Sequence, residues 1–187
     1  MPERASVAGR ERPRLFVALV LPEAARDRLA DWQQRELGNV DGIRIVPPDN
    51  LHVTIAFLGA RPAKDVDPIV ASLRRAAAAA SPPVLTPVRY RETRSVGMVV
   101  FDDEAKRAAA LAADVFTGLE ELGLYEREHR AWLSHVTVLR FRGRPPRLAP
   151  VLPALGPVSP SEVALYHSVL RPSGAQYEIV ESVALGG

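Results

Sequence analysis

The chain has 187 residues, a formal net charge of +2 and no cysteine, with 47% hydrophobic and 25% charged residues. This composition is typical of a globular protein that is long enough to bury a core, and the lack of cysteine excludes disulfides and thiolate chemistry. The small net charge does not by itself favour nucleic-acid binding, and no apolar run approaches the ~20 residues of a membrane helix.

We expect residues 1–13 to form a disordered tail and residues 14–187 to form the folded part of the chain. The N-terminal stretch carries charges of both signs and lacks the apolar core of a secretory signal. Together with the absence of cysteine, this favours a cytoplasmic protein without a membrane partner.

In the first half of the chain, hydrophobic patterns and helix-breaking residues predict three strands and two helices. Residues 15–21 form a near-continuous apolar run, which is typical of a strand buried on both faces. The pair Pro22-Glu23 then starts a helix that Gly38 ends. The remaining elements are a strand at 43–46, a strand that ends at Gly59, and a helix from Val66 into the alanines at 76–80.

The second half is predicted to contain strands at 84–90 and 95–101, a helix, and three further strands, at 135 onward, 162–170 and 177–185. Asp102 or Asp103 caps the helix and Gly123 ends it. The expected core face of the helix comprises Ala108, Leu111, Val115, Leu119 and Leu122. Clustered strands with only three helices predict an α+β fold with antiparallel sheets rather than a doubly wound parallel sheet.

Two tetrapeptides of the same pattern stand out. His52-Val53-Thr54-Ile55 is matched 83 residues later by His135-Val136-Thr137-Val138, which suggests two similar halves. Because side chains alternate along a strand, each motif predicts one polar face that carries His and Thr, and one apolar face. Strict alternation places Phe57 on the apolar face of the first strand. It likewise places Arg140 on the face opposite His135.

Two histidines that face one substrate atom can act as base and acid at the same pH, and threonine hydroxyls beside them can bind phosphate oxygens. A single motif of this kind is usually structural, but two copies with apolar backs favour in-line displacement at phosphorus. A metal site is the main rival, yet neither strand supplies a neighbouring acidic ligand. Of the other histidines, His129 lies in a charged run that predicts surface, and His167 could approach the site from a late strand.

The sequence resembles the two-histidine (2H) phosphoesterase superfamily, and within it the bacterial and archaeal RNA 2′,3′-cyclic phosphodiesterases once described as 2′-5′ RNA ligases. The resemblance extends over most of the chain from Arg14 onward. The segments that carry it are 14–19 (RLFVAL), 46–59 (VPPDNLHVTIAFLG), 130–140 (RAWLSHVTVLR), 163–168 (VALYHS) and 174–179 (GAQYEI). The resemblance implies one two-lobed domain over 14–187, with pseudo-twofold symmetry and a cleft between duplicated antiparallel sheets.

The resemblance also implies an activity, the hydrolysis of an RNA or nucleoside 2′,3′-cyclic phosphate to a 2′-phosphomonoester without metal or cofactor. His52 would be the proton donor and His135 the proton acceptor, while Thr54 and Thr137 would bind the phosphate, with Arg140 a further phosphate ligand. The substrates would be RNA 3′ ends or small cyclic nucleotides, and no obligate protein partner is implied. A non-catalytic protein that binds nucleotides or RNA ends, and a ligase that runs the reverse reaction, remain the alternatives.

The chain departs from the family pattern before the second histidine. The family usually has Arg-Pro-aromatic-x-Pro there, whereas this chain has Arg130-Ala131-Trp132-Leu133-Ser134. The segment 89–100 also lacks the aromatic residues common in relatives. These departures concern substrate choice more than chemistry, and the sequence assigns no role to Arg130, Trp132 or His167. Phe16 and Phe57 are predicted to pack in the core, with base stacking as the alternative.

Overall fold

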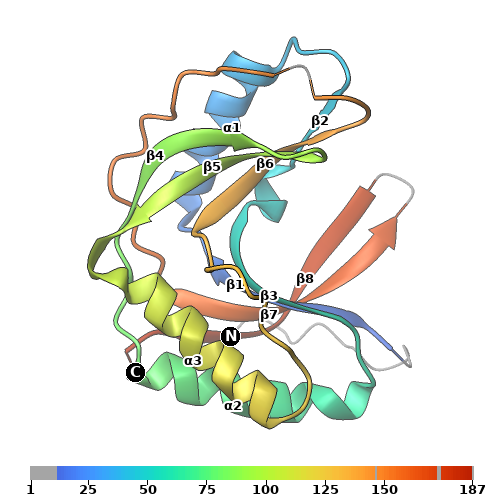
Figure 1. Ribbon diagram of the computed structural model, residues 1–187, viewed down its shortest axis with the longest axis vertical. Helices are drawn as coiled ribbons and strands as arrows, with labels where there is room; N and C mark the ends of the chain where they lie inside the picture. Colours follow the sequence, from blue (N-terminus) through green and yellow to red (C-terminus); the bar gives the residue numbers. More distant parts are fainter. Residues whose placement is uncertain (1–11, 146, 172–173, 187) are drawn as a thin grey trace.

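The computed structural model describes residues 12–145, 147–171 and 174–186 (Figure 1). Its helices and strands follow one another in the order that the sequence predicts. They are β1 Arg14–Val20, α1 Glu23–Leu37, β2 Ile43–Ile45, β3 His52–Ala60, α2 Val66–Ala79, β4 Leu85–Glu92, β5 Val96–Asp103, α3 Arg107–Glu121, β6 His135–Phe141, β7 Glu162–Arg171 and β8 Gly174–Ala184. Most of the predicted tail, residues 1–11, lies outside the described residues. None of the helices described is long and apolar enough to cross a membrane.

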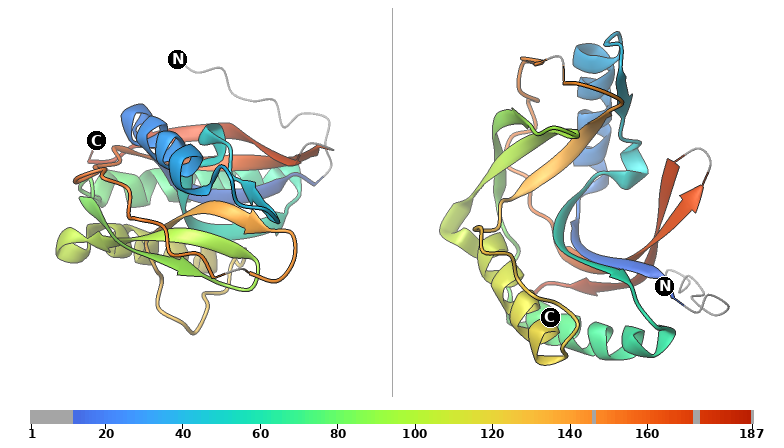
Figure 2. Two further views of the ribbon diagram at one scale, coloured as in Figure 1. Left: turned by 90° about the horizontal axis from the view of Figure 1, so that it is seen from above. Right: turned by 45° about the vertical axis from the view of Figure 1, so that its right-hand side comes forward.

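All strand pairs are antiparallel, which confirms the predicted α+β class. The strands form one eight-stranded sheet in the order β4-β5-β6-β3-β1-β7-β8, with β2 beside β6. At its centre, β3 and β6 share a single pair of Cα partners, Val53 and Val136. The sheet bends sharply there, so that β2 and β4–β6 make one lobe while β1, β3, β7 and β8 make the other (Figures 1 and 2).

The two lobes do not correspond to the two halves of the sequence, although the repeated motif suggests that they would. Helix α1 lies against the lobe formed by β2 and β4–β6, whereas α2 and α3 lie along the other lobe (Figure 1). The side-chain amide of Gln33 in α1 donates to the carbonyl oxygens of Val46 and Val138, at 3.0 and 2.6 Å. The chain therefore crosses between the lobes, and its first strand, β1, lies in the same lobe as its last two strands, β7 and β8.

Strand β1 is buried on both faces, as its apolar run predicts. Leu15, Val17 and Leu19 belong to the main hydrophobic core. On the opposite face, Phe16 and Ala18 belong to a smaller cluster with Ala164 and Tyr166 of β7. This smaller cluster forms the floor of the cleft between the lobes, because the first histidine motif packs against it.

The ends of α3 match the sequence prediction except at one residue. The carboxylate of Asp103 accepts hydrogen bonds from the backbone N–H groups of Ala108 and Ala109, at 3.0 and 2.8 Å, and so caps the helix. Gly123 follows the helix with φ of 67°, a conformation that suits glycine. Leu122 was predicted on the core face, but it is the residue that caps the C-terminus of the helix and is 37% exposed there.

Candidate active site

The two histidine motifs meet at the pair that joins the lobes. Because β3 and β6 run antiparallel through Val53 and Val136, the register sets His52 beside Thr137 and Thr54 beside His135. Both valines are fully buried, whereas the His and Thr side chains are partly accessible. This local twofold arrangement brings the two tetrapeptide motifs side by side.

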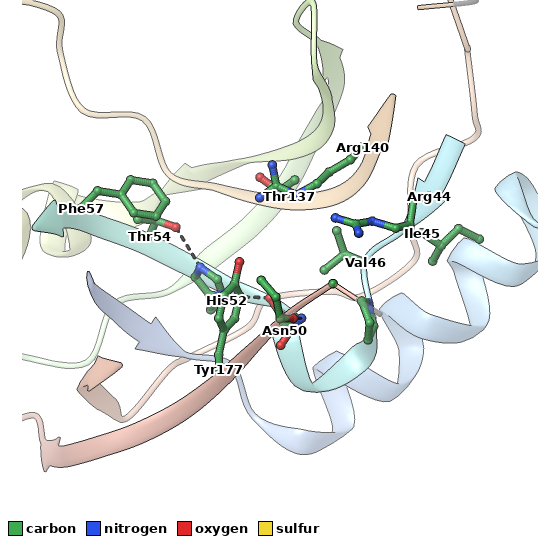
Figure 3. Close-up of a pocket in the computed structure, with 13 residues that line it drawn as sticks. Arg44, Ile45, Val46, Asn50, His52, Thr54, Phe57, Thr137, Arg140 and Tyr177 are labelled. Atoms are coloured by element: carbon green, nitrogen blue, oxygen red, sulfur yellow. Dashed lines mark hydrogen bonds between the residues drawn. The ribbon is translucent and has the colours of Figure 1, made fainter. Parts of the chain in front are cut away.

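A cavity of about 300 Å³ opens at this junction (Figure 3). Of the residues that the sequence points to, His52, Thr54, Thr137 and Arg140 line it, while His135 is not among the described lining residues. The other lining side chains include Arg44, Asn50, Phe57 and Tyr177. Figure 3 shows Thr137 and Arg140 on one side of the cavity, and His52, Thr54 and Tyr177 on the other.

A bulge in β3 turns Phe57 into the cleft. Ala18 of β1 is opposite Thr54, but the preceding Val17 is opposite Ala56, so Ile55 is an extra residue. Alternation resumes with its phase reversed, and Phe57 comes to face Phe16 with 69% of its surface exposed. The prediction that Phe57 packs in the core, on the face of Val53, was therefore wrong.

The equivalent bulge in β6 turns Arg140 into the cleft. Met98 of β5 is opposite Thr137 and Gly97 is opposite Leu139, so Val138 is the extra residue. Strict alternation predicted Arg140 on the face opposite His135. This prediction was wrong, because the bulge returns Arg140 to the face of His135 and Thr137. A signal was present in the sequence, because two consecutive apolar residues follow each motif threonine and break the period of two.

Both imidazoles are oriented in the same way by the backbone. The Nδ1 atom of His52 is 2.8 Å from the carbonyl oxygen of Asn50, and Nδ1 of His135 is 2.8 Å from that of Leu133. A carbonyl oxygen can only accept, so Nδ1 carries the proton in each ring. Nε2 is then left for chemistry, and in His52 it lies 2.9 Å from the hydroxyl oxygen of Thr54.

His52 is neutral at neutral pH in the free protein. Burial is the main cause that lowers its pKa from 6.5 to about 4, and the nearby charges of His135 and Arg140 lower it further, while its hydrogen bond to the Asn50 carbonyl acts in the opposite direction. A negative charge bound in the cavity would favour the protonated form of this ring. The site thus favours an anion and uncharged His52 when it is empty.

Aromatic side chains surround the ring of His52. Phe16 stacks on Tyr166 with ring centroids 4.9 Å apart, and its centroid is also 4.9 Å from that of His52. The rings of Tyr177 and His52 meet in a T-shaped arrangement, with centroids 5.4 Å apart. Phe16 is buried, so its predicted packing role holds. The position of Tyr177 was not predicted, because only the β7–β8 pairing brings it to the cleft.

Trp132 connects the two motif strands. Its indole N–H donates to the carbonyl oxygen of Thr54 at 3.0 Å, which ties the segment before β6 to β3. Arg130 pairs instead with Glu128 on the surface, and His129 is exposed. His167 is buried on the face of β7 opposite Tyr166, so it does not approach the cavity. Across the described ranges, no three His, Asp or Glu side chains gather as a group that could hold a metal ion.

Comparison with known proteins identifies the family. The model of the LigT-like phosphoesterases matches residues 19–88, which contain the first motif. The chain is 34% identical over 184 residues to the RNA 2′,3′-cyclic phosphodiesterase of Thermus thermophilus, covering 93% of this chain and 91% of that protein. It is 26% identical over 172 residues to the enzyme of the same name from Archaeoglobus fulgidus, with 88% and 96% covered.

Solved structures agree with this assignment. The protein TT0787 of Thermus thermophilus superposes with a TM-score of 0.75 at 30% identity, covering 93% of this chain and 98% of that one. Apo LigT of E. coli shares the fold with a TM-score of 0.80 at 23% identity, over 95% and 100% of the two chains. Identity that extends along nearly the whole sequence shows that the chain belongs to the LigT-like family of 2H phosphoesterases.

Proposed function

We propose that the protein hydrolyses the 2′,3′-cyclic phosphate of RNA 3′ ends, or of nucleosides, to a 2′-phosphomonoester. The observation that carries this proposal is the meeting of the two His/Thr pairs across the β3–β6 junction, beside an arginine that faces the same cavity. The names of the curated relatives, RNA 2′,3′-cyclic phosphodiesterases, supply the reaction class.

In the proposed mechanism, Nε2 of His135 removes a proton from a water molecule as its oxygen attacks phosphorus. The bond between phosphorus and O3′ breaks, and Nε2 of His52 donates a proton to O3′. The hydroxyls of Thr54 and Thr137, and the guanidinium of Arg140, hold the non-bridging oxygens as negative charge develops on them. Proton exchange with solvent then restores both rings. The assignment of donor and acceptor follows the family resemblance.

The donor role requires a protonated His52, and a bound substrate supplies a charge that raises its pKa from the low value in the empty site. A cyclic phosphate carries one negative charge, which counteracts the effects of His135 and Arg140 on the ring. Binding therefore favours the imidazolium that the reaction requires. The bound substrate thus favours the protonated form of His52, whereas His52 is uncharged in the empty site.

The proposal is tested by incubating the protein with nucleoside 2′,3′-cyclic phosphates in EDTA and identifying the product by phosphorus NMR. We expect turnover to persist in EDTA and the product to be the 2′-phosphomonoester. A 3′-phosphomonoester would reverse the leaving group, and loss of turnover on chelation would overturn the metal-independent mechanism. Tight binding of a 2′-phosphorylated nucleotide without any turnover would support the non-catalytic alternative instead.

A further inference from the structure

A second cavity, of about 470 Å³, opens beside the first. The two cavities share side chains from both lobes, among them Arg44, Phe57, Arg140 and Tyr177. Beyond these, the second cavity extends to Arg14, Ser168, Leu170 and Arg171. The two hollows therefore form one continuous cleft, and the proposed chemistry occupies only its inner part.

The strand register gives the direction and length of this cleft. On β1, Arg14, Phe16 and Ala18 share the face that looks into the cleft, with Ala18 opposite Thr54 of the first motif. Arg14 lies four residues from Ala18 and is paired with Ser168 of β7. At ~3.3 Å per residue, Arg14 is about 13 Å along the sheet from the row of the motif threonine.

The chemistry of the outer cavity is that of a site for a nucleotide. Its lining includes four arginines, and none of the described residues that line either cavity is acidic. Within the described part of the chain, the side chains of Arg14, Arg44 and Arg140 have no ion-pair partner. Two large apolar side chains in the same lining, Phe57 and Leu170, are 69% and 71% exposed. Free guanidinium groups suit phosphate oxygens, and an exposed ring suits a base.

We propose that the outer cavity binds the nucleotide that precedes the reactive one in an RNA chain. This inference rests on the proposed function, because a cyclic phosphate held between the motifs leaves only the 5′ oxygen of its ribose to continue the chain. Arg14 then contacts the phosphate that precedes the terminal nucleotide, and Phe57 stacks on a base at the boundary of the two cavities. Arg14 is then the residue through which the protein distinguishes a dinucleotide end from a free cyclic nucleotide.

The test compares kcat/KM for a dinucleotide that ends in a 2′,3′-cyclic phosphate with kcat/KM for the corresponding mononucleotide. In the wild type we expect the dinucleotide to be favoured by about tenfold, the size of one good charge-assisted contact. Arg14→Gln is expected to lower this ratio towards one. The matched control is Arg75→Gln, which removes an exposed arginine on α2 outside both cavities and should keep the wild-type ratio.

Salt dependence gives a second readout. Loss of one phosphate contact should reduce the slope of log KM against log salt concentration for the dinucleotide by about 0.7, the value for single strands. Equal kcat/KM for both substrates in the wild type, or an unchanged ratio in Arg14→Gln, would overturn the inference. Failure of the proposed function has a different signature, since the wild type would then turn over neither substrate.

Discussion

At the scale of single residues, the environment of His52 couples the site to stability. Its pKa of about 4 lies below the value of 6.5 for an unperturbed imidazole, so the unfolded chain binds a proton more readily than the folded protein. The stability that follows from a neutral His52 is fully present above pH 6.5. It is lost progressively as the pH falls from 6.5 to about 4, because the unfolded chain takes up a proton in this range that the buried ring of the folded protein does not.

This linkage predicts a difference between the wild type and His52→Gln. The wild type should lose about 2 kcal/mol more of its free energy of unfolding between pH 7.5 and 4.5 than the variant, which has nothing to titrate at this position. Urea unfolding at the two pH values measures both losses. The same pH dependence in wild type and variant would show that His52 has an ordinary pKa in the folded protein.

At the scale of secondary-structure elements, the bulges decide which side chains enter the cleft. The bulge at Val138 is held from behind, because its carbonyl oxygen accepts hydrogen bonds from the backbone N–H of Val46 at 3.0 Å and from Gln33 at 2.6 Å. The extra residue in β6 is thus fixed by helix α1, and Arg140 depends on it for its direction. Gln33 is buried, and we expect it to act as a positioning residue for this site.

Gln33→Leu is expected to raise KM for cyclic phosphates several-fold, because the bulge relaxes and Arg140 turns out of the cavity. The variant should also lower the free energy of unfolding by about 1–3 kcal/mol, since the carbonyl of Val46 loses the Gln33 donor and that of Val138 loses one of its two donors. In the Arg140→Gln background, the effect of Gln33→Leu on KM should disappear while its effect on stability remains.

Trp32→Phe is the control for this cycle. It removes another buried hydrogen bond of α1, the one from the Trp32 indole to the carbonyl of Val151, without touching the bulge. We expect it to lower stability and to leave KM at the wild-type value. Additive effects of Gln33→Leu and Arg140→Gln on KM would contradict the positioning role.

The same bulges mark the limit of what the sequence predicts. Periodicity was sufficient for the order of the elements, for the doubly buried strand at β1 and for the polar face that carries His52 and Thr54. It failed at Phe57 and at the face of Arg140, because strict alternation was assumed across residues that the strands do not pair one to one. Arg44 and Tyr177 were missed for another reason. Only the pairing of β2 with β6 and of β8 with β7 brings them to the cleft.

At the scale of the whole molecule, one pair of strand partners, Val53 and Val136, joins the two lobes of the sheet, and the site lies between the lobes. The interleaved path of the chain, with α1 on one lobe and β1 on the other, builds each lobe from segments of both halves of the sequence (Figure 1). The hydrogen bond from the Trp132 indole to the Thr54 carbonyl oxygen also links the two motif strands across the junction. The catalytic proposal requires this junction to hold both imidazoles at a single phosphorus atom.

The most direct test of this claim is the turnover of nucleoside 2′,3′-cyclic phosphates by His52→Ala and His135→Ala, with the exposed His129→Ala as control. Each motif variant should lose 10²- to 10⁴-fold in kcat, which is the contribution of a general acid or base. Circular dichroism and the unfolding midpoint of each variant report whether it keeps the fold. The control should retain wild-type turnover. Wild-type kcat in either motif variant would contradict the two-histidine mechanism.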